Sequence, residues 1–207
     1  MSPWLQVLAF GILGYLGGSL PFALWITRLV KGVDVRKAGS GHATATNTFR
    51  QAGLIPGTVV FALDIAKGFL PTYLAIELGS MVWIPPITAG LAVVGHCWPV
   101  LAGFRGGMGL ATAGGTILAC SPLGFVLCLG VLVALTLALH HAARASVIAG
   151  LIRPFLLWLF NMEAETIAVS GAVGLVIALR FLGDWRRQYR ELWLDRDADT
   201  GEGNEHV

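Results

Sequence analysis

The stretch from Gly95 to Thr112, GHCWPVLAGFRGGMGLAT, is a short polar connection between two strongly apolar segments. It brings His96, Arg105 and several glycines together at the point where a membrane helix should end. Glycines just before a helix leave backbone N–H groups accessible, and the positive end of the helix dipole adds to their attraction for an anion. The stretch therefore predicts two membrane helices joined by a loop that binds an anion at the membrane surface.

The composition agrees with a protein that lies in a membrane. Of the 207 residues, 56% are hydrophobic and 13% are charged, and the mean hydropathy is +0.73. Soluble domains carry about 25% charged residues, so this composition excludes an ordinary soluble domain. Cys97, Cys120 and Cys128 form no CxxC pair and have no histidine pair at metal spacing, so neither a disulfide framework nor a metal site is expected.

Apolar segments follow one another along almost the whole chain. Residues 1–27 lack the basic start of a cleavable signal and predict a retained first span. Six further apolar segments lie at residues 54–78, 82–101, 110–120, 123–140, 147–160 and 167–182. Several are shorter than the roughly 20 residues of a perpendicular span, so we expect these to be bent or packed against protein. The expected fold is an all-α integral membrane protein with about seven transmembrane helices.

Charged residues indicate the orientation of these spans. The basic residues outside the spans fall in alternate connections and in the C-terminal segment: Arg28, Lys31, Arg36, Lys37, Arg50, Arg105, Arg144, Arg186, Arg187, Arg190 and Arg196. The remaining connections contain Glu77, Glu163 and Glu165 and no basic residue. By the positive-inside rule, the N-terminus lies outside and the C-terminus in the cytoplasm.

The C-terminal segment differs in character from the rest of the chain. Residues 1–194 are expected to form a single transmembrane domain, and residues 185–194, WRRQYRELWL, to lie along the inner leaflet as a short helix. Residues 195–207 are acidic and almost free of apolar side chains, which is typical of a disordered cytoplasmic tail.

Asp64 and Lys67 are charged residues inside an apolar segment, spaced so that they share one helix face. A charge in hydrocarbon costs about 3 kcal/mol or more, and a mutual ion pair that faces the protein interior is the usual remedy. Two interpretations remain open: a structural pair that stabilises helix packing, and a direct role in binding a substrate.

Residues 37–50, KAGSGHATATNTFR, form a connection rich in hydroxyls and small residues. Glycine lets backbone N–H groups approach an anion, hydroxyls add donors, and an arginine binds phosphate with two parallel hydrogen bonds. The pattern fits a phosphate site, although Gly and Ser also form plain turns. The candidate residues are Gly39, Ser40, Gly41, Thr46, Asn47 and Arg50.

The connection at residues 104–109 repeats this chemistry, with Arg105, Gly106 and Gly107 leading into the segment that begins near Leu110. His96 lies at the same end of the preceding segment, where it can bond a hydroxyl or a phosphate and titrate near neutral pH. A lone histidine there is more often structural. Two anion-binding connections and a histidine on one membrane face favour a functional site instead.

Five motifs in order resemble a known family: GSLPFALWI at 18–26, GSGHATATNTFR at 39–50, DIAKGFLP at 64–71, GHCWPV at 95–100 and FRGGMGLAT at 104–112. The family comprises the bacterial membrane-bound acyl-phosphate:glycerol-3-phosphate acyltransferases of the PlsY type. The resemblance implies a seven-span fold in the inner membrane and an active site that faces the cytoplasm. It implies transfer of a fatty acyl group from acyl phosphate to the 1-hydroxyl of glycerol 3-phosphate, giving lysophosphatidic acid and phosphate for phospholipid biosynthesis. No cofactor and no nucleic acid partner are expected, and the oligomeric state stays open.

The resemblance also assigns roles to residues at matching positions. Ser40 and His96 match catalytic positions. The substrate-binding matches are Thr46, Asn47 and Arg50 in the first loop, with Arg50 on glycerol 3-phosphate; Gly106 and Gly107 on acyl phosphate; Ser146 on glycerol 3-phosphate; and Asp64 and Lys67 in the DxxKG element.

The chain departs from the family pattern at several of these positions. Met108 stands where the family's glycine loop has a lysine, and Arg105 is a candidate to supply the missing cation. His42 and Thr44 stand where the first loop usually has Asn and Gly. Near the end of the last span, an HRxN element is replaced by 180–184, RFLGD, in which Arg180 and Asp184 are spaced to pair with each other.

Three hypotheses about function follow. The first is an active, divergent acyltransferase, since Ser40, Asn47, Arg50 and His96 are retained. The second is a paralogue that keeps the fold as a non-catalytic membrane protein that binds phosphate or lipid, or that regulates. The third, a small transporter, is disfavoured because the sequence shows no self-similar halves.

Overall fold

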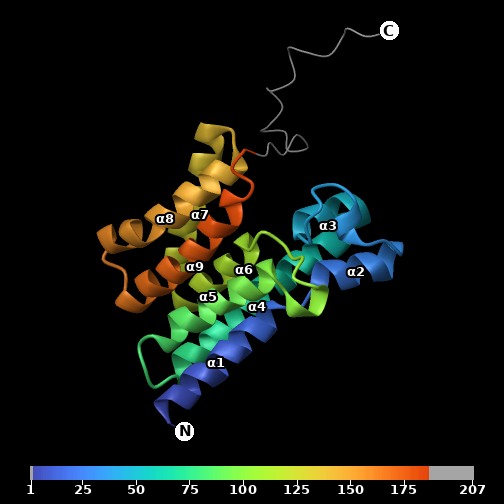
Figure 1. Cartoon of the computed structure of the whole chain (residues 1–207). Helices are drawn as coiled ribbons and strands as arrows, with labels where there is room; N and C mark the ends of the chain where they lie inside the picture. The colour runs from blue at the N-terminus through green and yellow to red at the C-terminus, as the bar shows by residue number, and fades with distance from the viewer. Residues whose placement is uncertain (1, 187–207) are drawn as a thin grey trace, which may run out of the picture.

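The computed structural model describes residues 2–186, and these residues form helices without strands. The elements, in chain order (Figure 1), are α1 Pro3–Gly18, α2 Phe22–Lys31, the 3₁₀ turn η1 Val35–Lys37, α3 Ala45–Ala52, α4 Leu54–Leu78, α5 Ile84–Cys97, the 3₁₀ turn η2 Val100–Ala102, α6 Leu110–Cys120, α7 Pro122–Leu139, α8 Ala142–Leu159 and α9 Ala164–Leu182. The expected all-α membrane fold is confirmed. The predictions for residues 187–207, including the acidic tail and most of the interfacial helix, lie outside the described residues.

Six helical stretches in the described part of the chain are long and apolar enough to cross a membrane: Pro3–Lys31, Leu54–Leu78, Ile84–Ala102, Pro122–Leu139, Ala142–Leu159 and Ala164–Leu182. The remaining expected span, α6, has 11 residues. At 1.5 Å per residue it is about 16 Å long, which is half of a hydrocarbon core about 30 Å thick. The count of seven and the orientation of the termini therefore stay predictions.

The first expected span is not one continuous helix. It ends at Gly18 and resumes at Phe22, because Pro21 has no N–H to donate and disfavours a helical residue before it. α2 is amphipathic: it buries Ala23, Leu24 and Thr27 and exposes the basic residues Arg28 and Lys31 in its last turn.

The segment expected at residues 147–160 begins five residues earlier as α8. The Nδ1 atom of His141 accepts a hydrogen bond of 3.4 Å from the backbone N–H of Arg144, and this bond caps the new helix start. Arg144 therefore lies in the first turn of α8 instead of in the connection before it.

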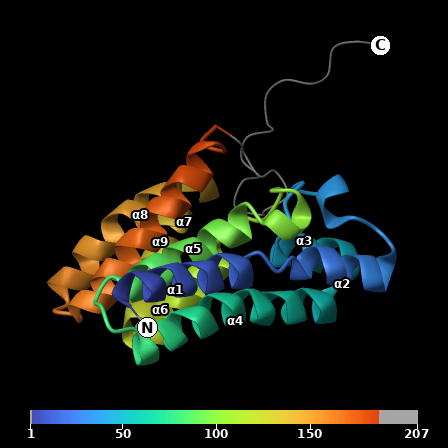
Figure 2. The ribbon, with the colours of Figure 1, turned by 60° about the horizontal axis from the view of Figure 1, so that its bottom comes forward.

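Small residues set the close helix crossings. Gly14 and Gly18 of α1 lie against the backbone of Thr88 and Ala92 of α5, so these two helices run in the same direction. Such contacts drive helix association where lipid removes the hydrophobic force between helices. Figure 2 shows α1, α4 and α5 side by side, with α7, α8 and α9 forming a second group beside them.

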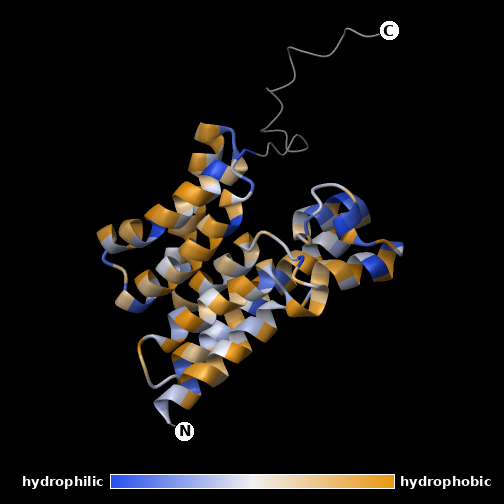
Figure 3. Cartoon of the chain, viewed as in Figure 1, coloured by the Kyte–Doolittle hydropathy of each residue, from blue (hydrophilic) through white to orange (hydrophobic). Residues whose placement is uncertain are grey.

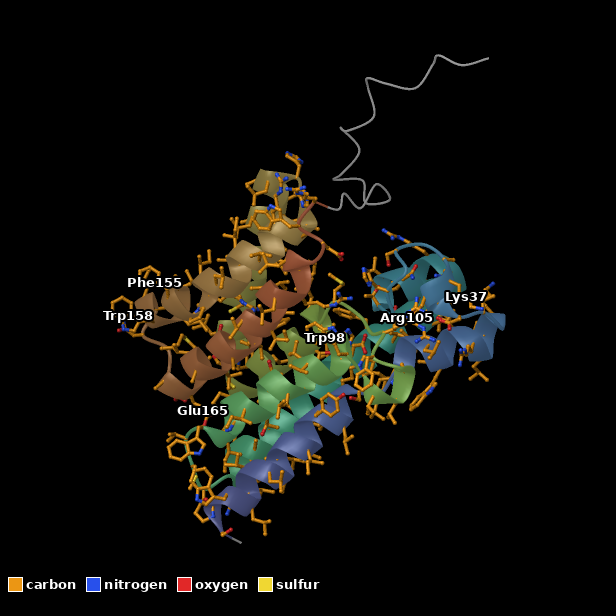
Figure 4. The ribbon with its side chains drawn as sticks, viewed as in Figure 1. Lys37, Trp98, Arg105, Phe155, Trp158 and Glu165 are labelled. Atoms are coloured by element: carbon orange, nitrogen blue, oxygen red, sulfur yellow. The ribbon has the colours of Figure 1, made fainter. Side chains whose placement is uncertain are left out.

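Polar residues gather at one end of the helices. α2, α3 and the loops around them carry most of the hydrophilic colour in Figure 3, while the outer faces of the long helices are apolar. Phe155 and Trp158 project from the periphery of α8 in Figure 4 and are about 60% exposed, as expected of side chains in contact with lipid. The polar end contains the loops in which the sequence predicted a site.

Candidate active site

A cavity of about 310 Å³ opens at the polar end, between the first loop, α4, α5, α6 and α9. Five residues of the predicted site contribute to its wall. They are Ser40, Thr46, Arg50, Asp64 and His96. The cavity therefore brings together the predicted catalytic pair and residues from three separate sequence motifs.

The start of α6 forms one wall of this cavity. Gly109 adopts φ +85°, a left-handed conformation that favours glycine, and so turns the chain into the helix. The first hydrogen bond of the helix runs from the N–H of Ala113 to the carbonyl of Gly109, at 2.8 Å. The N–H groups of Leu110 and Ala111 precede this bond, and both residues line the cavity. This wall has the donors and the dipole of an anion site.

Gly106 and Gly107 do not line this cavity, and their N–H groups are used within the protein. Gly106 donates to the carbonyl of Cys97 at 3.2 Å, and Gly107 donates to that of His96 at 3.1 Å. A Cβ atom on Gly107 would overlap the His96 ring and lie 2.6 Å from the carbonyl oxygen of Ala43. The glycine pair thus allows the loop to pack directly on His96. The backbone N–H groups at the cavity wall are those of Leu110 and Ala111, a few residues further along the chain.

His96 belongs to a buried row of ionisable side chains. The carboxylate of Asp64 lies 2.9 Å from Lys67 Nζ and 3.6 Å from His96 Nδ1, and all three side chains are almost fully buried. Lys67 Nζ also donates to the carbonyl of Leu20 at 2.9 Å, in the break between α1 and α2. Asp64 and His96 line the cavity, whereas Lys67 lies behind them. Lys67 links Asp64 to the break between α1 and α2, which supports the structural interpretation of the pair. A role of the pair in binding substrate stays a prediction.

Asn47 is bonded within the first loop and does not line the cavity. Its amide nitrogen donates to the carbonyls of Val35, Ala38 and His42, at 2.7, 3.0 and 3.0 Å, and its oxygen accepts from Gln51 at 3.0 Å. The residue is fully buried and is not among those that line the cavity. Asn47 therefore shapes the loop from within.

The rest of the first loop is fixed by local bonds. Gly39 packs against the oxygen of Asn47, and Gly41 is exposed at φ +74°. Thr44 Oγ1 caps α3 by accepting from the N–H of Asn47 at 3.1 Å. These contacts leave Ser40, Thr46 and Arg50 at the cavity wall.

Asp34 and Arg36 connect the first loop to the second. Arg36 donates to the Asp34 carboxylate through Nε at 2.9 Å and through Nη2 at 2.7 Å, and to the Ala102 carbonyl at 2.8 Å. The hydrogen bond from the Arg36 side chain holds the pKa of Asp34 well below its usual range. Arg28 adds a second, more exposed ion pair at 3.2 Å.

Arg180 and Asp184 do not pair with each other as the sequence predicted, because His42 lies between them. His42 Nε2 is 3.2 Å from the Asp184 carboxylate, and His42 Nδ1 is 3.2 Å from Arg180 Nη2. Arg180 Nε also donates to the carbonyl of Gly107 at 3.0 Å, and its guanidinium lies over the Trp98 ring. Two departures from the family pattern thus meet in one network that joins α9 to both loops. Sequence spacing alone does not reveal a contact across 138 positions.

The family profile described as glycerol-3-phosphate acyltransferase matches residues 8–191. The chain belongs to the glycerol-3-phosphate acyltransferase family. A relative of that name from Listeria monocytogenes is 34% identical over 180 residues, covering 85% of this chain and 89% of the relative. One from Moorella thermoacetica is 37% identical, covering 76% of this chain and 79% of the relative.

Solved structures of this acyltransferase family share the fold. Crystal structures of PlsY, an integral membrane glycerol 3-phosphate acyltransferase, in a glycerol 3-phosphate form and a lysophosphatidic acid form, match with TM-scores of 0.76 and 0.75. Each is 34% identical in sequence, and each match covers 87% of this chain and 90% of the other. The resemblance inferred from the five motifs is confirmed.

The structure shows where the residues that differ from the family pattern lie relative to the cavity. Met108 is 7% exposed, lines the cavity and packs in the main apolar cluster. Arg105, which the sequence suggested as a substitute cation, is exposed and is not among the residues that line the cavity (Figure 4). Ser146 is buried on α8, one turn from Ala142, which does line it. Arg180 lies beside the glycine loop, where it donates to the Gly107 carbonyl, but like Arg105 it is not among the residues that line the cavity.

Proposed function

We propose that this chain transfers a fatty acyl group from acyl phosphate to the 1-hydroxyl of glycerol 3-phosphate, producing lysophosphatidic acid and phosphate. The proposal rests on one observation: Ser40, Arg50, Asp64, His96 and the start of α6 all line the same cavity. Membership of the glycerol-3-phosphate acyltransferase family supports the same reaction.

The start of α6 is the proposed site for the phosphate of the acyl donor. Leu110 and Ala111 present N–H groups that precede the first hydrogen bond of the helix, and the dipole favours negative charge there. The acyl group is already activated as a mixed anhydride, so no covalent enzyme intermediate is needed. Positioning and polarisation of the carbonyl then supply the catalysis.

Arg50 and Thr46 are the proposed binding groups for the phosphate of glycerol 3-phosphate, since both line the cavity from α3. The acceptor hydroxyl forms a bond to the acyl carbon while the bond from that carbon to the phosphate oxygen breaks. The hydroxyl proton goes to His96, whose Nδ1 lies 3.6 Å from the negatively charged Asp64 carboxylate. The phosphate leaves with the electron pair of the broken bond. We assign Ser40 to positioning the acceptor beside His96.

The proposed location is the plasma membrane, with the cavity on its cytoplasmic side and the N-terminus outside. The basic residues Arg28, Arg36, Lys37 and Arg50 lie on or between α2 and α3 at the end that carries the cavity, as the positive-inside rule requires. Acyl phosphate reaches this site from the lipid, and glycerol 3-phosphate reaches it from the cytoplasm.

The test is product formation by the purified chain in lipid nanodiscs, given acyl phosphate and glycerol 3-phosphate. Lysophosphatidic acid is measured by mass spectrometry, and the phosphate released into solution is measured in parallel. We expect turnover by the wild type, a loss of about 10²- to 10⁴-fold in His96→Gln, and no loss in His140→Asn, a matched change at an exposed histidine. A folded wild type that binds both substrates without forming product would refute the proposal and support the non-catalytic paralogue.

A further inference from the structure

His42 is a cavity residue to which the proposed reaction assigns no role. Its side chain is 14% exposed, and each ring nitrogen meets a partner at the end of α9. Nδ1 lies 3.2 Å from Arg180 Nη2, and Nε2 lies 3.2 Å from the Asp184 carboxylate. Phe181, which lies between these two partners in the chain, also lines the cavity. His42 therefore joins two walls of the cavity, the first loop and the end of α9.

The partners of His42 determine which ring nitrogen carries the hydrogen. A guanidinium has only donors, so Arg180 donates and His42 Nδ1 accepts. An imidazole that accepts at Nδ1 is neutral and carries its hydrogen on Nε2, and the Asp184 carboxylate accepts from that N–H. Turning the ring over would replace both nitrogens by C–H groups and lose both bonds. The ring is therefore held in one tautomer and one orientation.

The backbone of His42 connects this fixed ring to Ser40. Ser40 lies between Gly39 and Gly41, which adopt φ +60° and +74°, and the conformational freedom of glycine leaves a serine between them little restrained. The N–H of His42 lies 3.5 Å from Ser40 Oγ, at the limit of a hydrogen bond, and the His42 carbonyl accepts from the Asn47 amide at 3.0 Å. Asn47 thus anchors this backbone within the loop, and the His42 ring anchors it to α9.

The anchored segment belongs to the acceptor side of the cavity. The groups proposed to bind or position glycerol 3-phosphate, Ser40, Thr46 and Arg50, come from the first loop and α3. The groups proposed to bind the donor phosphate lie at the start of α6 instead. A change in the His42 ring should therefore affect the acceptor more than the donor.

We propose that His42 is a positioning residue for the acceptor, because its bonds to Arg180 and Asp184 tie the loop that carries Ser40 to α9. This inference rests on the proposed acyl transfer to glycerol 3-phosphate. The ring acts through Ser40: it keeps the serine hydroxyl at the cavity wall, where the acceptor binds beside His96. The role requires one acceptor and one donor on the side chain, so a residue that offers both can replace the histidine.

The experiment compares His42→Leu with His42→Gln in lipid nanodiscs, with rates expressed per folded enzyme from thermal unfolding. Leucine has no polar atom, whereas glutamine keeps an acceptor for Arg180 and a donor for Asp184. We expect His42→Leu to lower kcat/KM for glycerol 3-phosphate about 10- to 100-fold, because misplacement by about 1 Å has an effect of that size. The KM for acyl phosphate should stay within about twofold of the wild type. His42→Gln should lie within about fivefold of the wild type, and His140→Asn, at an exposed histidine, should match it.

Three results would overturn the role of His42 alone, given an active wild type. The first is a His42→Leu protein within about threefold of the wild type in kcat/KM. The second is a His42→Gln protein as slow as His42→Leu, since the bonds of the ring would then not be what matters. The third is a KM for acyl phosphate raised as much as that for glycerol 3-phosphate. A folded wild type that binds both substrates without turnover would overturn the proposed function, and this inference with it.

Asp184 offers the same test from the other partner if His42→Leu fails to fold. Asp184→Leu should lower kcat/KM for glycerol 3-phosphate as His42→Leu does, while Asp184→Asn keeps an oxygen acceptor and should lie within about fivefold of the wild type. The two leucine changes interrupt one chain of bonds, so the double variant should be no slower than the slower single variant. Fully additive losses, or a wild-type rate in Asp184→Leu, would contradict the proposal.

Discussion

Replacing Gly107 by alanine should displace His96 while leaving the other polar side chains of the cavity in place. The new Cβ would overlap His96 Nε2 and lie 2.6 Å from the Ala43 carbonyl oxygen. The backbone on both sides is fixed, since Gly107 donates to the His96 carbonyl and accepts from Arg180. The imidazole, as the more mobile neighbour, must therefore move by about 1 Å, and a shift of that size in a reacting group costs about 10²-fold in rate.

The measurement is kcat/KM for lysophosphatidic acid formation, with thermal unfolding recorded on the same preparations. Overpacking of about 1–3 kcal/mol should also lower the unfolding midpoint by several degrees. Gly130→Ala is the matched control: a Cβ there meets no atom within 4 Å, so activity and stability should stay at wild-type values. A folded Gly107→Ala protein with kcat/KM within about threefold of the wild type would show that the fit between this loop and His96 does not control the reaction.

Four further changes test other parts of the site. Arg180→Gln removes the donors to Gly107 and His42, and kcat/KM should fall about 10- to 100-fold; an unchanged value would contradict its role in positioning the loop. Thr44→Ala removes the cap of α3 and should lower stability by about 1 kcal/mol, measured by denaturant unfolding. The ion pair that lowers the pKa of Asp34 should make the wild type more stable than Asp34→Asn, with the full difference present above about pH 4. The difference should disappear as the pH falls below that value, because the carboxylate then becomes protonated. A difference in stability that stays constant between about pH 3 and about pH 7 would exclude the ion pair as the cause of that difference. Met108→Lys places a cation in the cavity wall and should lower KM for acyl phosphate about 3- to 10-fold at some cost in stability; a raised KM would place the donor phosphate elsewhere.

The helices were predictable because each apolar run is long and bounded by polar residues. α6 begins at Leu110 and ends at Cys120, as the pattern predicted. The break before Phe22 was missed, although Gly18 and Pro21 are its local signals, because the apolar character continues across it. Hydropathy predicts where a chain enters the membrane better than where it bends there.

The sequence predicted which residues would belong to the candidate site better than it predicted the directions of their side chains. The motifs predicted that Ser40, Arg50 and His96 share one site, and all three line one cavity; their roles stay predictions. They do not indicate which way a side chain points, and Asn47 points into its own loop. The network of His42 depends on contacts between distant segments, which a single sequence does not reveal.

α6 is too short to cross a membrane by itself. Its 11 residues measure about 16 Å, about half of a hydrocarbon layer about 30 Å thick. The helix is therefore held by its neighbours: it packs along α4, where Gly115 lies directly against the backbone of Ile65. In the proposed reaction, the group that binds the donor phosphate is thus anchored by protein contacts and not by the lipid around it.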